Sequence, residues 1–196
     1  MKFALKTMAL VALLSLPLVF QSTLTEILKL RTFDYFVAEY EQSNHFAVLN
    51  ITEEDIEREG GWPLPRARLA EIQNELISRG ALGVGWAVAF PQPDRLGGDE
   101  EFARSLQGSN SVLAMYENEG SGFPETVGTV IIGNSVGGYS ASGVVQNIEV
   151  LRNAASQGIA SAPADIDQLV RRMPLLMKTP DGWVPAFGTQ VLKVLA

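Results

Sequence analysis

One stretch of the sequence matches a catalytic pattern. Gly133-Asn-Ser135-Val-Gly137 follows the apolar run Thr129–Ile132, and G-x-S-x-G after a strand is typical of a nucleophile elbow, where the serine hydroxyl attacks an acyl carbon. A serine hydrolase also needs a base, and in that fold the histidine follows the serine. The only histidine, His45, lies far upstream. The pattern therefore favours a glycine- and serine-rich loop, and a hydrolase using Ser135 is the alternative.

Other residues capable of site chemistry do not form metal or nucleotide motifs. One histidine and no cysteine do not suffice for a zinc site. The acidic stretch from Glu53 to Glu59 lacks the calcium-loop pattern, so it indicates a solvated helix face. Gly83-x-Gly85 is not a dinucleotide fingerprint. We expect neither a metal nor a cofactor.

Composition narrows the class of protein. The chain has 196 residues, 46% hydrophobic and 19% charged, which indicates one folded domain with an appendage. Its net charge of −7 disfavours a nucleic-acid partner, because phosphate binding needs a positive field.

The N-terminal region predicts a membrane anchor at residues 1–25. Thr7 to Thr25 carry no charge, and a helix of about 20 apolar residues spans a bilayer. Lys2 and Lys6 precede this run, so the positive-inside rule places the rest of the chain outside the cytoplasm. The small residues of a signal-peptide cleavage site are missing, which favours an anchor over a cleaved peptide.

Residues 26–44 predict a helix that continues out of the membrane. Apolar residues recur at three- and four-residue intervals from Leu24 to Tyr40. This stripe either packs on the domain or pairs with a twin helix in a homodimer.

Residues 45–196 predict an α/β domain organised around a strand at Ala81–Phe90. Its even positions are large, whereas Gly83, Gly85 and Ala87 leave the other face bare. A run of this kind is typical of a central strand buried on both faces. The bare face either lies against a closely packed helix or floors a small-ligand pocket.

The preceding elements suggest a ligand site at one end of this strand. Phe46–Thr52 predicts the first strand, Thr52 opens a capping-box helix, and Ala67–Arg79 predicts a second helix. Strand, helix and strand imply a parallel pair whose ends share one edge. We therefore expect 52–55 and 91–94 to face each other there, where open α/β sheets bind ligands.

The remaining pattern completes a mostly parallel, mixed sheet covered by helices and ending in a β-hairpin and a helix. Adjacent strand residues Arg171 and Arg172 face opposite ways, so at most one points inward, where it could hold an anion or pair with Asp165 or Asp167. The other expected elements are helices at 99–106, 144–155 and 187–195, strands at 111–116 and 126–132, a loop at 117–125, and a hairpin through Trp183-Val184.

The order of several motifs resembles the CHASE type 2 family. They include Phe33-Asp-Tyr35, Gly61-Trp-Pro-Leu-Pro-Arg66, the stretch Gly80 to Asp94, and Asp165-Ile-Asp-Gln-Leu-Val-Arg-Arg-Met-Pro-Leu175. The resemblance covers 30–196. It implies a non-catalytic, extracytoplasmic sensor domain of a bacterial receptor, held by an N-terminal membrane helix and followed by further membrane helices and a nucleotide cyclase or kinase output.

Two positions depart from the family pattern. Thr52 and Ala87 stand where members typically carry aspartates. If those carboxylates belong to the family's ligand site, this protein senses something different or has lost that site.

The sequence therefore predicts a ligand-sensing domain, dimeric, at the outer face of the membrane, and cut from a longer receptor. Its signal is an unidentified small molecule or protein, and a periplasmic protein-binding scaffold is a further alternative. The residues expected at the sensing site are Thr52, Glu53, Trp62, Arg66, Asp94 and Arg171.

Overall fold

The structure is a computed structural model, and it describes residues 6–8, 11, 15, 23–37, 43–123, 138–180 and 182–196. The chain divides into two compact units. The first comprises Met1–Leu49 and Ala164–Arg171, and the second comprises Asn50–Pro163 and Arg172–Ala196.

In the first unit, the principal described element is helix α2 (Thr23–Phe36). Leu30 is its buried residue, while most other side chains of α2 are exposed. The predicted anchor falls largely outside the described residues. Within the described ranges, no helix combines the length and apolar character that crossing a membrane requires.

The second unit contains a parallel sheet whose central strand is β2 (Asn110–Glu117). Strand β1 (Gly83–Trp86) lies on one side of β2 and β4 (Ser156–Ile159) on the other, both parallel to it. The two-residue strand β3 (Val144–Val145) pairs antiparallel with the end of β2. The prediction of a mostly parallel, mixed sheet covered by helices is confirmed.

The prediction of a central strand at 81–90 is wrong. Only Gly83–Trp86 pairs, and among the described strands its one neighbour is β2. Side chains replace the ladder beyond Trp86, since the Tyr116 hydroxyl donates to the Ala87 carbonyl (2.7 Å) and the Phe90 N–H donates to Asn147 Oδ1 (2.7 Å). The central strand is instead β2, whose residues 111–115 are all buried.

The predicted first strand at 46–52 is also wrong. This segment forms no strand with the described part of the chain, and the Val48 side chain is 85% exposed. A β-rich composition stabilises a strand only where neighbouring strands and a packed face are present. The boundary between the two units falls inside this segment, after Leu49.

Two further predictions concern the 117–155 region. The helix expected at 144–155 is wrong, because the chain forms β3 and the short helix α6 (Glu149–Arg152). The Asn147 side chain donates to the Ala114 carbonyl of β2 (3.1 Å) and to Gln157 (2.8 Å), which ties this residue to the sheet, and the helix begins after it at Glu149. The strand expected at 126–132 lies outside the described residues.

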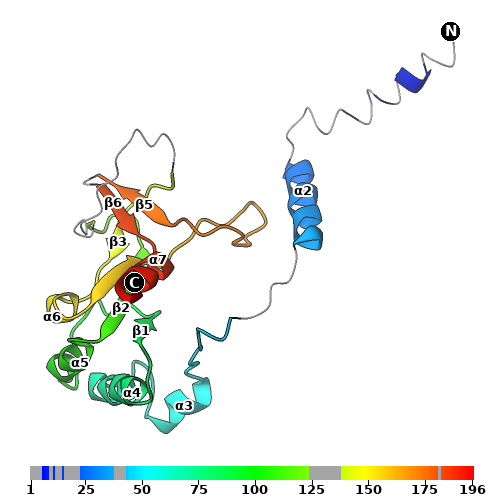
Figure 1. The fold of residues 1–196 in the computed structure, drawn as a ribbon. Helices are drawn as coiled ribbons and strands as arrows, with labels where there is room; N and C mark the ends of the chain where they lie inside the picture. The colour runs from blue at the N-terminus through cyan, green and yellow to red at the C-terminus, as the bar shows by residue number, and fades with distance from the viewer. Residues whose placement is uncertain are drawn as a thin grey trace. The chain divides into compact units, whose positions relative to one another are not determined.

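The large side chains of β1 and its extension form a core with helices α4 (Arg66–Ser78), α5 (Asp99–Leu106) and α6. Phe102 sits at its centre, and its ring makes edge contacts with Trp86 (5.2 Å) and Phe90 (5.4 Å). Figure 1 shows α4, α5 and α6 following one flank of the sheet. The predicted helices at 53–59, 67–79 and 99–106 are confirmed as α3 (Glu53–Arg58), α4 and α5.

The bare face of β1 lies against helix α7 (Phe187–Leu195). A Cβ at Gly85 would stand 3.0 Å from the Phe187 ring, and one at Gly83 would stand 2.8 Å from Leu195 Cδ2. The closely packed helix is therefore the correct one of the two interpretations. Gly158 of β4 also lies close against α7, because a Cβ there would lie 2.7 Å from the Phe187 Cα.

The predicted hairpin and terminal helix are confirmed. Strands β5 (Leu176–Thr179) and β6 (Gly182–Pro185) pair antiparallel, and α7 follows directly. Met177 and Val184 of the hairpin join Met115 and Ile159 in a second core cluster.

Candidate functional site

The two segments that were expected to face each other are both engaged locally. Thr52 caps α3: its Oγ1 accepts the Asp55 N–H (3.2 Å), and the Asp55 carboxylate accepts the Thr52 N–H (3.1 Å) and hydroxyl (2.7 Å). These bonds hold the pKa of Asp55 below its ordinary value. Across the described chain, no hydrogen bond or ion pair joins 52–55 to 91–94.

Asp94 fastens together the beginnings of two helices. Its Oδ2 accepts the N–H of Arg66, the first residue of α4 (2.9 Å), and the N–H of Gly98, the N-cap of α5 (3.3 Å). A Cβ on Gly98 would lie 2.5 Å from the Ala67 nitrogen, so the two helix starts touch. Burial works to raise the pKa of Asp94, but the N–H donors outweigh it and the pKa lies below its ordinary value.

The Arg66 side chain fills the same junction. Its guanidinium lies over the Phe90 ring (4.3 Å to the centroid), and its Nε pairs with Asp99 Oδ1 at 3.4 Å. Burial lowers the pKa of Arg66, and Asp99 and Asp94 partly offset that shift. The structure thus brings together two predicted site residues, Arg66 and Asp94, and uses their charges to join α4 to α5.

Besides Thr52, the predicted site residues Trp62 and Glu53 are exposed to solvent. Trp62 is 54% exposed in the turn between α3 and α4, and Glu53 is exposed in the first turn of α3. Unlike Arg66 and Asp94, they present free surface to a ligand.

Arg171 lies in the first unit, at the end of the segment Ala164–Arg171, here named the Arg171 loop. Its side chain is only 6% exposed. Nε and Nη2 donate to the two carboxylate oxygens of Asp34 (2.7 and 2.8 Å), and Nη1 and Nη2 donate to those of Asp167 (both 2.7 Å). Nη1 also donates to Asp165 (3.1 Å). These bonds use all five N–H groups of the guanidinium.

The carboxylates around Arg171 come from two sources. Asp165 and Asp167 belong to the loop itself, whereas Asp34 comes from α2, 137 residues away in sequence. Hydrogen bonds from Arg171 hold the pKa of Asp34 below its ordinary value and lower that of Asp167 to about 2, and they raise the pKa of Arg171. The predicted pairing of an inward arginine with Asp165 or Asp167 is present for Arg171 with both residues. The sequence interpretation missed Asp34, although it stands in the Phe33-Asp-Tyr35 motif.

The carboxyl end of β2 carries a network that the sequence interpretation missed. Glu117 accepts from the Tyr139 hydroxyl and from the N–H (2.8 Å) and hydroxyl (3.1 Å) of Ser142. Burial works to raise the pKa of Glu117, but these donors lower it below its ordinary value, while the bond to Glu117 raises the pKa of Tyr139. Each Glu117 oxygen is occupied from within the chain, so the network anchors 138–142 to the sheet. A glutamate closing an otherwise apolar strand is the signal that could have revealed it.

Of the two residues that the hydrolase alternative concerns, the structure describes His45. Ser135 lies outside the described residues. His45 is exposed in a turn, where its Nδ1 lies 2.9 Å from Ser43 Oγ.

The comparison with known protein families covers nearly the whole chain. A family model described as CHASE2 domain matches residues 8–196. No curated protein and no solved structure in the comparison matches the chain. The match spans the first unit and the second, including α2, the Arg171 loop and the sheet. The chain therefore belongs to the CHASE2 domain family, a family of sensory domains.

Proposed function

We propose that this chain is the extracytoplasmic input domain of a bacterial membrane receptor with a nucleotide cyclase or kinase output. The carrying observation is the CHASE2 match over 8–196, which includes most of the uncharged run from Thr7 to Thr25. That run has the length of a bilayer span, with Lys2 and Lys6 on the side that the positive-inside rule assigns to the cytoplasm.

The absence of cysteine from the sequence makes the topology directly testable. Glu100→Cys places one thiol on an exposed position of α5, and Phe3→Cys places one before the uncharged run. In intact cells whose outer membrane has been permeabilised, a membrane-impermeant maleimide should label Glu100→Cys, and should label Phe3→Cys only after lysis. Labelling of both variants before lysis, or of neither, contradicts the proposal.

For the sensing surface, we propose the exposed residues Thr52, Glu53 and Trp62, with Arg66 and Asp94 fixing the turn beside them. Trp62 combines a large apolar ring with an N–H donor and is more than half exposed, which suits it to contact a ligand. A small-molecule thermal-shift screen should yield compounds whose shift disappears in Trp62→Ala but persists in Trp183→Phe. A screen without hits, alongside a protein captured at this surface, favours the scaffold alternative.

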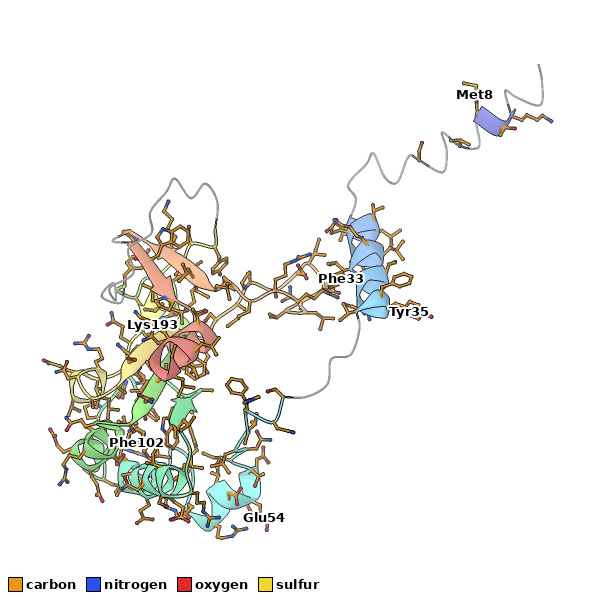
Figure 2. All side chains as sticks on the ribbon, in the orientation of Figure 1. Met8, Phe33, Tyr35, Glu54, Phe102 and Lys193 are labelled. Carbon is orange, nitrogen blue, oxygen red and sulfur yellow. The ribbon has the colours of Figure 1, made fainter. Side chains whose placement is uncertain are left out.

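We also propose a homodimer formed along α2. Leu24, Leu28 and Tyr35 repeat at helical spacing, and Tyr35 is 84% exposed. Figure 2 shows Phe33 and Tyr35 on opposite flanks of the helix. Oxidation should cross-link Leu28→Cys into dimers far more than Glu26→Cys, because residues two apart on a helix point to nearly opposite sides. Equal cross-linking of Leu28→Cys and Glu26→Cys contradicts a dimer interface on this face of α2.

A further inference from the structure

The Arg171 loop holds its arginine in place largely with its own residues. Asp165 and Asp167 accept three of the five guanidinium bonds from within the loop. The backbone closes around them, since the Asp165 N–H donates to the Leu169 carbonyl (2.9 Å) and the Gln168 N–H donates to the Asp165 carbonyl (2.9 Å). Gln168 takes a φ of 65°, which a non-glycine residue keeps only where surrounding structure imposes it.

This arrangement leaves one edge of the guanidinium for a partner. Nε and one N–H of Nη2 form a planar fork, and a fork of this kind matches the two oxygens of one carboxylate. Asp34 of α2 occupies that fork with both oxygens. Asp34 is also the most exposed of the three carboxylates, with 38% of its side chain accessible, against 23% for Asp165 and 8% for Asp167. Its bond is therefore the one most open to exchange with solvent.

The loop is covalently continuous with the second unit at both ends. Pro163 precedes Ala164, and Arg172 follows Arg171, and both flanking residues belong to the second unit. Helix α2 is joined to that unit by the chain that runs through residues 37–50. A contact between Asp34 and Arg171 thus makes a second attachment of α2, and this attachment can open without breaking the chain.

We propose that the Arg171 loop is a preformed carboxylate receptor, that Asp34 is its built-in ligand, and that opening of this pair uncouples α2 from the sensor unit. The proposal rests on the sensory function for its meaning, because α2 directly follows the expected membrane anchor. A conformational change in the second unit would reach α2 through the Arg171 loop while the Asp34–Arg171 pair is closed, and would not reach it through the loop while the pair is open.

The test is a distance measurement on the full chain in nanodiscs. Spin labels at Lys29→Cys on α2 and Val170→Cys on the loop occupy exposed positions in an otherwise cysteine-free protein. Dilution with unlabelled chain removes distances between copies. With Asp34 present we expect one narrow distance, and Asp34→Asn should broaden it or add a longer component. Glu26→Gln is the matched control, because it also replaces a carboxylate of α2 by its amide, and the partner of Glu26 in the parent chain, Lys29 (3.4 Å), is already replaced by the labelled cysteine.

A fluorescence measurement and one further variant separate release of α2 from misfolding. All three tryptophans, Trp62, Trp86 and Trp183, lie in the second unit, so their fluorescence should be the same in Asp34→Asn and the parent. Asp34→Glu retains a carboxylate and should restore part of the narrow distance. An unchanged distribution in Asp34→Asn, or equal broadening in Glu26→Gln, overturns the proposal. Those outcomes do not affect the result of the maleimide labelling assay. Failure of the proposal for Asp34 and Arg171 is therefore distinguishable from failure of the receptor assignment.

Discussion

Asp34 and Arg171 meet in a two-bond ion pair (2.7 and 2.8 Å) although 137 residues separate them. Asp34 belongs to α2, and Arg171 ends a loop that already surrounds its guanidinium with two other carboxylates. This ion pair joins the two sequence segments of the first unit.

Acidification should open the pair only at low pH. The pKa values of Asp34 and Asp167 lie below their ordinary values, that of Asp167 at about 2, so the stabilisation is complete above the ordinary aspartate pKa near 4 and is lost as pH falls toward 2. Two other charges act on Asp34: Asp167 works to raise its pKa, and Arg31 works to lower it. The labelled chain should keep its narrow distance from pH 8 to about 4, and the Asp34→Asn chain should show no such transition. Opening between pH 5 and 7 contradicts this assignment.

Replacement of Arg171 by lysine should release α2 despite conserving the charge. An ammonium group has no planar fork, so it cannot bind both oxygens of Asp34 and Asp167 at once. We expect the distance distribution of Arg171→Lys to resemble that of Asp34→Asn. Arg172→Lys is the control at the neighbouring position and should retain the parent distribution. A parent-like distribution in Arg171→Lys would show that charge alone holds the contact.

Removal of the Asp94 carboxylate should destabilise the junction of α4 and α5. Asp94→Ala leaves the N–H groups of Arg66 and Gly98 without their shared acceptor, and we expect a loss of about 2 kcal/mol in the free energy of unfolding. Urea unfolding followed by tryptophan fluorescence measures it. Glu101→Ala, at an exposed position of α5, should change the value by less than about 0.5 kcal/mol. Equal effects of the two variants would remove the structural role from Asp94.

A single methyl group should disturb the packing of α7. In Gly158→Ala the new Cβ would lie 2.7 Å from the Phe187 Cα, so the helix must shift, and we expect destabilisation of about 1–3 kcal/mol. Gly188→Ala adds the same group within α7 where nothing lies within 4 Å. That variant should be neutral or more stable by about 0.4–1 kcal/mol. The urea midpoint of Gly158→Ala should therefore lie clearly below that of Gly188→Ala. Coincident midpoints contradict the close contact between Gly158 and α7.

Neutralising Glu117 should lower the pKa of Tyr139. The bond from the Tyr139 hydroxyl to the Glu117 carboxylate raises that pKa above its ordinary value near 10. In Glu117→Gln, ultraviolet titration of the tyrosines at alkaline pH should show one group ionising earlier, and Tyr139→Phe should lose that group from both backgrounds. An identical titration in Glu117→Gln would show that the carboxylate does not perturb Tyr139.

The sequence predicted the elements whose signals are local. The capping box at Thr52 and the helical pattern of Ala67–Arg79 lie within or next to the elements that they predict, and the structure contains both as α3 and α4. The small side chains of Gly83 and Gly85 likewise predicted a close helix, although the sequence could not say that α7 supplies it.

Tertiary structure decided the features that depend on a distant partner. Phe46–Thr52 has strand composition but pairs with none of the described strands. The strand at 81–90 shortens to four residues, and the Tyr116 and Asn147 side chains bond its backbone beyond Trp86. The sequence indicated a site role for the charged residues Arg66, Asp94 and Arg171. It did not indicate that Asp99 pairs with Arg66 or that Asp34 pairs with Arg171. Residue type and spacing determine what an arginine can bind, whereas only the folded chain determines which carboxylate reaches it, because charge pairs form through space rather than along the sequence.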